Sequence, residues 1–304
     1  MSRGSKVVLS YAPQTSKEIP KSGWKILPYT SNGLGANFEN TESETITDSR
    51  LTQAGMPTSA EVQGDVEAEF AKDAYDDLLA AAAFNEWVAK SKSLTFGGDT
   101  AKAFAIESAY KDVGVYHYHG GMMVNTLSLS IGDSGYAKVK FGFMGKDYKN
   151  QNDTAFSKTP TPAGALQRVT SLSVEDIKID GITTKGVACV TEFSFELDNN
   201  MQVQKCLGGG MFAGNLLEMM AKMSGSLTLA YGKKAQEIIN KQITGATAAI
   251  EVTLKLADGS KYVLVIPKAQ VKGETPSGGM NDLIKQQVQY TVVEQAPTLT
   301  KVPV

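Results

Sequence analysis

Alternation of polar and non-polar residues runs through most of the chain and predicts a protein built mainly of β-strands. Between residues 62 and 70, small and apolar side chains alternate with the acidic side chains of Asp65, Glu67 and Glu69. A period of two places successive side chains on opposite faces of a strand, so this segment has one buried and one acidic face. Comparable runs predict strands at residues 25–27, 34–46, 104–110, 124–131, 136–144, 177–179, 192–197, 226–231, 249–256, 262–266 and 282–293.

Two segments, residues 73–87 and 233–243, change to helical spacing of their apolar residues. Asp73, Asp76 and Asp77 crowd the first turn of the former, where carboxylates interact favourably with the helix dipole. A divalent-cation site is the alternative interpretation of these three aspartates. The expected fold class is therefore mainly β with a minor helical part (α+β).

Long polar segments interrupt the strands. Residues 47–58 contain Gly55 and Pro57, and residues 198–222 contain three consecutive glycines, so neither is expected to form a core strand. Loops of this length are unusual inside a compact domain unless they have a function of their own. We therefore expect both to be arms that reach a neighbouring molecule.

The two halves of the chain share one order of elements, which predicts an internal duplication. A shift of 161 residues superposes Gly64 on Gly225. The same shift superposes Lys72 on Lys233, Ala74 on Ala235 and Leu78 on Ile239, and shorter shifts superpose Phe38 on Phe195 and the stripe Val139, Phe141, Phe143 on Val288, Tyr290, Val292. Two units of this size predict tandem β-sandwich or barrel domains, each with one packed helix, because one-sided strands need a cover. The expected boundaries are a flexible arm at 1–22, a first domain at 23–148, a linker at 149–168, a second domain at 169–295 and a tail at 296–304.

Composition and charge narrow the range of functions. The formal net charge of −2 gives no reason to expect a protein that holds nucleic acid through phosphate contacts, which requires a basic surface. Two cysteines, Cys189 and Cys206, are too few for a disulfide framework, so a reducing compartment is expected. No apolar run approaches the ~20 residues of a membrane helix, and residues 1–20 lack the apolar core of a signal peptide.

The polar residues do not predict a catalytic, cofactor or metal site. His117 and His119 share a strand face, which would allow a metal site, but no carboxylate or cysteine lies near them in the sequence. Paired surface or interface histidines are the favoured interpretation. The glycines at 208–210 lack the lysine and the following Ser/Thr of a phosphate-binding loop, which leaves a flexible loop.

Several stretches, taken in their order along the chain, resemble the phage tail tube proteins. The longest is SAEVQGDVEAEF at residues 59–70, which is followed by YDDLLAAA at residues 75–82. Further stretches lie at residues 42–50, 121–130, 141–146, 193–200 and 262–267. The resemblance spans roughly residues 23–295, and residues 1–22 and 201–223 have no counterpart in it.

This resemblance implies a β-sandwich protein without catalytic residues or cofactors, which forms rings stacked through long loops around a channel for DNA. It implies a structural subunit of the virion tail, assembled in the bacterial cytoplasm, in a long and non-contractile (siphophage) tail. Combined with the duplication, a trimeric ring with pseudo-six-fold symmetry is favoured over a hexamer. The expected partners are other copies of the chain, the tape-measure protein, and the tail terminator and distal tail proteins. DNA passes without specific binding, and no membrane is involved.

Two sets of residues are candidates for these roles. The loop residues expected at inter-subunit or inter-ring contacts are Asp48, Arg50, Leu51, Met56, Pro57, Met201, Leu207, Met211 and Phe212. Asp65, Glu67 and Glu69 are candidates for the lumen face, where negative side chains repel DNA phosphates, and a solvated outer face is the alternative. Two other functions stay open: the inner tube of a contractile tail or a related injection machine, and a carbohydrate-binding β-sandwich module.

Overall fold

The structure is a computed structural model, and it describes residues 3–46, 48, 51–185, 188–274, 276, 279–280 and 283–304. Its helices are α1 (Asp76–Ala82) and α2 (Lys233–Thr244), with short 3₁₀ turns at Gly4–Lys6 and Ser171–Ser173. Its strands are β1 (Val7–Pro13), β2 (Lys25–Ile26), β3 (Ser31–Asn32), β4 (Gly35–Thr41), β5 (Met56–Glu69), β6 (Ser93–Thr95), β7 (Phe104–Tyr110), β8 (Val115–Ile131), β9 (Lys138–Gly145), β10 (Asp147–Asn152), β11 (Val174–Ile179), β12 (Ile182–Thr183), β13 (Val190–Asp198), β14 (Gln202–Gln204), β15 (Asn215–Leu217), β16 (Lys222–Ala230), β17 (Thr247–Lys255), β18 (Lys261–Gly273), β19 (Lys285–Val292) and β20 (Thr298–Val302). The expectation of a mainly β chain with two helices is confirmed.

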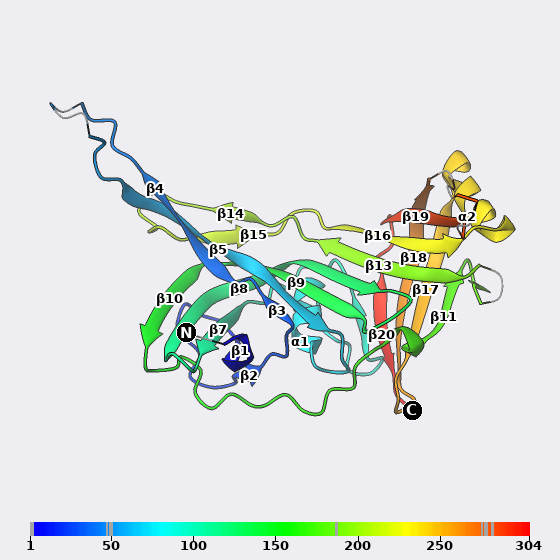
Figure 1. Ribbon diagram of the computed structural model, residues 1–304, viewed down its shortest axis with the longest axis horizontal. Coiled ribbons are helices and arrows are strands. Elements are labelled where there is room, and N and C mark those ends of the chain that lie inside the picture. The colour runs from blue at the N-terminus through cyan, green and yellow to red at the C-terminus, as the bar shows by residue number, and fades with distance from the viewer. Residues whose placement is uncertain are drawn as a thin grey trace.

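Eight antiparallel strands form the main sheet, in the order β4–β5–β9–β8–β13–β16–β19–β18. In Figure 1 this sheet crosses the molecule from β4 and β5 on the left to β16 and β19 on the right. The pairing of β8 with β13 joins the strands of the first half of the chain to those of the second half. Backbone hydrogen bonds therefore run without a break across the middle of the chain.

The long strands β8 and β18 each run from the main sheet into a second layer of strands. The first part of β8 pairs with β7 and β10, and its second part pairs with β9 and β13. A bulge at Gly120 and Gly121 interrupts the pairing with β7, and Gly121 adopts a positive φ of 61°. In β18 a bulge at Pro267 and Lys268 separates the part that pairs with β20 from the part that pairs with β19. Bulges bend a strand and tolerate glycine and proline, so each strand can turn from one layer into the other.

An apolar core fills the space between the layers, and both helices cover it from the same side of the main sheet. α1 packs against β8, and α2 packs against β18 and β17. Every residue from Leu78 to Ala82 is buried, because the small alanines let the helix lie close to the strands. The expected helix at 73–87 is shorter in the structure, since Asp73 and Phe84 have positive φ angles that end helical geometry on either side.

The ends of the described chain differ from expectation. Residues 7–13 were expected to belong to a flexible arm, but they form β1, which pairs along its whole length with β7. Leu9 and Tyr11 of this strand are buried in the core. Near the other end, the segment expected to be a tail contains β20, which pairs with β18 and β6. Both expectations were wrong because a single short apolar run does not reveal a partner that lies far away in the sequence.

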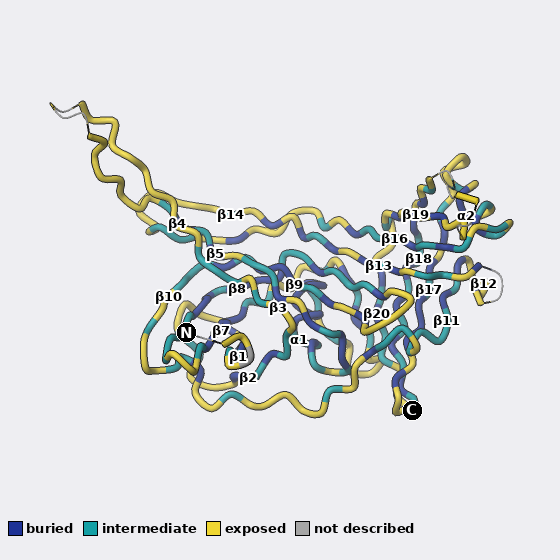
Figure 2. The backbone as a smooth tube through the Cα atoms, in the orientation of Figure 1, coloured by how far each residue is buried: buried dark blue, intermediate teal, exposed yellow. Residues whose placement is uncertain are grey.

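Two hairpins project from the body (Figure 1). The first arm consists of β4, the start of β5 and the connection between them (residues 42–55). Its outer part extends far beyond the rest of the sheet. The second arm is residues 199–221, in which β14 and β15 form a small separate hairpin where an irregular loop was expected. Figure 2 shows that the outer part of the first arm is almost entirely exposed.

The same set of strand pairings occurs in both halves of the chain. In the first half the pairs are β1–β2, β1–β7, β7–β8, β8–β9, β9–β5, β5–β4 and β8–β10. In the second half they are β11–β12, β11–β17, β17–β18, β18–β19, β19–β16, β16–β13 and β18–β20.

Gly64 is required for the close approach of β5 to the segment between β3 and β4. Its φ is +149°, and a Cβ atom at this position would lie 2.2 Å from the backbone oxygen of Gly33. We expect Gly64→Ala to lower the free energy of unfolding by about 2–4 kcal/mol, from overpacking and backbone strain together. Urea unfolding of the unassembled chain measures this. Gly35→Ala is the control, because no heavy atom lies within 4 Å of its added Cβ, and its effect should stay within about 0.5 kcal/mol. Equal effects of the two substitutions would contradict the argument.

Candidate functional site

The main sheet has one face that neither helix covers, which we call the open face. Over its central part, the side chains that alternate with core residues are all polar or charged (residues 65–69, 126–130, 138–140, 192–198, 222–228 and 285–291). Six of them are carboxylates and four are lysines, and the rest are serine, threonine or glutamine. A polar sheet face of this extent needs no cover and is suited to contact with water.

Asp65, Glu67 and Glu69 all lie on this open face, on β5, but they are not a bare acidic surface. The Lys140 Nζ atom lies 2.7 Å from an Asp65 carboxylate oxygen and 3.8 Å from a Glu67 oxygen. The Asp65 carboxylate raises the pKa of Lys140 above its ordinary value, mainly through their hydrogen bond. Arg168 lies 2.5 Å from Glu69. Basic partners therefore offset the acidic residues that the sequence pattern singled out.

Sequence reasoning missed these basic partners, although one signal was present. Lys138 and Lys140 alternate with apolar residues in the strand next to β5, and β9 pairs with β5 so that Lys140 lies opposite Glu67. Opposite charges across neighbouring strands stabilise a sheet. Arg168 follows the irregular segment after β10, and its position next to β5 was not predictable from spacing.

The charged side chains in the second half of the open face are more widely spaced, and serine, threonine and glutamine residues lie among Glu192, Glu196, Asp198, Lys222 and Lys285. The hydroxyls of Ser194 and Ser226 lie 2.9 Å apart across β13 and β16. Glu192 accepts a hydrogen bond from Thr228 at 3.2 Å. These contacts give this part of the face a surface of hydroxyl groups with scattered carboxylates.

The outer part of the first arm presents apolar side chains to solvent. Ile46 is 97% exposed, Leu51 81% and Met56 73%, with Asp48 and Pro57 exposed beside them. Arg50 lies outside the described residues. Exposed apolar side chains gathered on one projecting element mark a surface that another molecule covers.

The second arm lies along the base of the first arm within the same chain. The Ala60 N–H donates a hydrogen bond to the Met211 carbonyl (2.8 Å). The Phe212 ring packs edge-to-face on Phe38, with 6.4 Å between centroids. Lys205 lies 3.7 Å from Glu61. These contacts place Met211 and Phe212 against their own chain.

Two other residues of the second arm have opposite environments. Leu207 is fully exposed at the tip. Met201 is buried in a small apolar cluster with Phe84, Met123 and Leu216. Met201 therefore leaves the set of candidate contact residues, whereas Leu207 stays in it.

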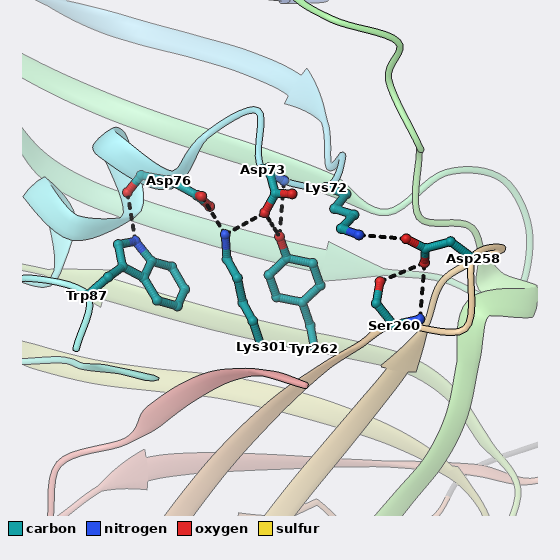
Figure 3. Close-up of polar contacts among 8 residues, drawn as sticks. All are labelled: Lys72, Asp73, Asp76, Trp87, Asp258, Ser260, Tyr262 and Lys301. Atoms are coloured by element: carbon teal, nitrogen blue, oxygen red, sulfur yellow. Dashed lines mark hydrogen bonds and ion pairs between the residues drawn. The ribbon is translucent and has the colours of Figure 1, made fainter. Parts of the chain in front are cut away.

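The three aspartates at the start of α1 are held by lysines, as Figure 3 shows for Asp73 and Asp76. Lys301 of β20 forms ion pairs with both of them and lies 4.6 Å from the centroid of the Trp87 ring. Lys25 lies 2.6 Å from Asp77. Because each carboxylate has a lysine partner, this cluster ties α1 to the strands around it and does not resemble a cation site.

A second ion pair lies beside this cluster. Lys72, just after β5, lies 2.5 Å from Asp258 in the β17–β18 turn, and Ser260 also donates to Asp258 (Figure 3). These partners lower the pKa of Asp258 to about 2. The Asp73 N–H donates to the Tyr262 hydroxyl at 3.1 Å. Together, the polar contacts in Figure 3 form a clamp between the first and second halves of the chain.

The two histidines pack on an aromatic ring. His117 Nδ1 lies 2.6 Å from the Tyr148 hydroxyl, and both imidazole rings contact the Tyr148 ring. Among the described residues, no group of three His, Cys, Asp or Glu side chains is placed to hold a metal ion. In the same part of the chain, no helix has the length and apolarity of a membrane span.

Burial of His119 generates a pH dependence. The side chain is 1% exposed, and burial lowers its pKa from 6.5 to about 4. Between these pH values the unfolded chain binds a proton that the folded chain does not, so stability falls as the pH falls. We expect a loss of about 3 kcal/mol from this group between pH 7 and pH 4. Urea unfolding across this range measures it. His119→Gln removes this component and should give a shallower dependence, and an unchanged slope would contradict the assignment.

Comparison with known proteins places these features in a family. Residues 4–292 match the family model described as phage tail tube protein. The match covers almost the whole chain, including both halves of the main sheet and both arms. A comparison with curated proteins finds no match.

Proposed function

The chain belongs to the phage tail tube family, and on that premise we propose that it polymerises as stacked rings into a tube that conducts DNA to the host. The family is structural and not enzymatic, and its members assemble as homo-oligomers in the virion tail. The observation that carries the proposal is the combination of an open polar sheet face with two projecting arms. An extended sheet suits a tube wall, and arms suit contacts between subunits or rings.

We also propose that the chain contains two tandem copies of one domain. The repeated set of strand pairings supports this. So do two glycines 161 residues apart: a Cβ on Gly64 would meet the backbone oxygen of Gly33, and a Cβ on Gly225 would lie 2.1 Å from that of Ser194. Residues 33 and 194 are again 161 apart. The bulges in β8 and β18 interrupt equivalent pairings, with β7 and β17 respectively.

The pairing register changes one detail of the proposed duplication. Phe143 lies opposite Gly64, and Tyr290 lies opposite Gly225. Phe143 therefore corresponds to Tyr290 and not to Val292, as the apolar stripe suggested. A displacement of two residues keeps every side chain on its face, so the sequence pattern alone could not detect it.

A trimeric ring follows from the duplication as the favoured stoichiometry. Three chains would place six similar domains around the axis, and a main sheet of eight strands per chain would give a closed wall of twenty-four strands. Barrels of ~16–18 strands already leave an aqueous channel, so such a wall is wide enough for one. A hexameric ring is the alternative, and top views of assembled tubes distinguish the two.

The open face is the proposed lumen surface, with Asp65, Glu67 and Glu69 on it. Its carboxylates slightly outnumber its lysines, and neighbouring opposite charges compensate each other. Such a wall offers phosphates no continuous basic track, so DNA slides along it without specific binding.

The proposed partners beyond copies of the chain are the tape-measure protein inside the tube and the tail terminator and distal tail proteins at its ends. A non-contractile tail is favoured, and a sheath in purified particles would indicate the inner tube of a contractile tail instead. Membership of a structural tail tube family sets aside the carbohydrate-binding module.

The first arm supplies a test of assembly. We expect Ile46→Ser combined with Leu51→Ser to leave a folded chain that no longer forms tubes, because the apolar contact of the tip is lost. Negative-stain microscopy and thermal unfolding measure the two properties. Leu172→Ser is the control, because Leu172 is 94% exposed but lies outside both arms. Tubes of normal length and width from the double variant would contradict the role of the arm.

The open face supplies a test of DNA passage. We expect Gln287→Lys combined with Thr291→Lys to leave tube formation intact but to slow DNA ejection several-fold, with a stronger dependence on salt, because added lysines attract phosphates. Neither position lies directly opposite a lysine. The matched control adds two lysines at Gln236 and Asn240 of α2, on the opposite side of the sheet. Ejection at the parental rate from the open-face variant, or equal slowing by both, would place the lumen elsewhere.

A further inference from the structure

Strands β8 and β13 join the two halves of the chain edge to edge, and we call this contact the seam. β13 pairs with the second part of β8, with Leu197 opposite Leu127 and Asp198 opposite Thr126. The leucines point into the core, and the two polar residues point to the open face.

The corresponding edges at the two ends of the main sheet have no partner strand within the described chain. β4 pairs only with β5, and the last residues of β18, from Val271 to Gly273, pair only with β19. Asn37 on β4 and Lys272 on β18 are both exposed and point to the open face. On the β18 edge, the Gly273 N–H donates to the side chain of the exposed Gln242 at 3.1 Å, which an incoming strand would displace. The other N–H and C=O groups that point outward from such edges can pair with another strand.

The repeated pairings determine which residues on these free edges correspond to those of the seam. Ala36 lies opposite Val62, and Leu197 lies opposite Met223. The second pair follows the first by 161 residues, the same separation as between Gly64 and Gly225. Ala36 therefore corresponds to Leu197, and Asn37 corresponds to Asp198.

The other edge is aligned in the same way. Gly273 lies opposite Val288, and Leu127 lies opposite Phe141. Val288 and Phe141 are themselves opposite Leu227 and Val66, which are 161 residues apart. Gly273 therefore corresponds to Leu127, and Lys272 corresponds to Thr126.

We infer that the edge of β4 in one protomer pairs antiparallel with the end of β18 in the next protomer, with Ala36 opposite Gly273 and Asn37 opposite Lys272. The occupant of each free edge is a second copy of this chain, and the contact repeats the β8–β13 seam. This inference rests on the proposed function, and it adds the register of the ring contact.

Side-chain chemistry agrees with this register. At the core side, Ala36 and Gly273 are a smaller pair than the two leucines, and Ile239 of α2 fills the space in front of Gly273, where an added Cβ would lie 2.6 Å away. At the open face, Lys272 would lie beside Asn37 and diagonal to Glu39. Glu274 would lie opposite Gly35, which has no side chain to repel it. A slip by one residue would set Lys272, on the open face, opposite Ala36 or Phe38, which lie on the core face, so the two sheets would present opposite faces.

Disulfide cross-linking tests the register on the assembled protein. The variant carries Asn37→Cys and Lys272→Cys, with Cys189→Ser and Cys206→Ser to remove the two exposed free thiols. Directly opposite Cα atoms lie about 4.5–5.5 Å apart, within the roughly 4.4–6.8 Å that a disulfide spans. We expect oxidation of tubes to link chains covalently, with a three-chain product as the limit for a trimeric ring. Tubes assembled from a mixture of the Asn37→Cys variant and the Lys272→Cys variant should give only two-chain products.

The control pair is Glu39→Cys with Lys272→Cys, which represents a slip of two residues on the same face. In the proposed register these positions are diagonal neighbours about 7–8 Å apart, so roughly fivefold less product is expected. Tubes that form normally but cross-link no better through Asn37 than through Glu39 would overturn the register and leave the tube function standing. A chain that stays monomeric at every concentration and gives no cross-link would overturn both.

Discussion

Backbone hydrogen bonding between β8 and β13 joins strands from two similar halves into one sheet of eight strands. Because the partners come from different halves, neither half needs to close on itself, and in the described part of the chain each has an edge without a partner strand at its far end. The same pairing aligns the polar faces of both halves into one open face. The clamp of Lys301 and Lys72 with aspartates on the opposite side of the sheet keeps the halves from rotating about this seam. Edges, open face and arms therefore depend on one set of backbone bonds.

The bends in β8 and β18 explain how each half builds a core under such a sheet. A flat antiparallel sheet with one polar face must bury its other face against a second layer. The bulges at Gly120–Gly121 and at Pro267 let one strand belong to both layers, so no additional loop is needed to connect the layers. α1 and α2 then fill the space between the layers, which keeps the opposite face free of any cover.

Sequence patterns predicted the elements whose amphipathicity is local and missed those that depend on distant partners. β7 and α2 were placed within one residue at each end, because their periodicity and turns are visible in a single window. The second half of β5 was also predicted, but β5 begins at Met56, within the segment expected to be a loop. β1 was missed because its short apolar run follows a polar start, and the first part of β8 because Tyr and His alternate there without aliphatic residues. For the site, the pattern identified the face that carries Asp65 but not the cross-strand partner Lys140, since pairing register is not encoded by one strand alone.

If the open face lines the lumen as proposed, its partly compensated charges suit the passage of DNA better than a uniformly acidic wall would. Like charges on neighbouring strands destabilise a sheet, and in a closed ring this repulsion would add up around the axis. Pairing Asp65 and Glu67 with Lys140 reduces that cost, and Lys140 stays engaged with carboxylates and is less available to phosphates. In the second half, hydroxyl and amide groups lie among three carboxylates and two lysines on the open face. On the proposed lumen surface, a lysine held by its neighbouring carboxylates would serve two requirements, a stable sheet and weak affinity for a passing polyanion.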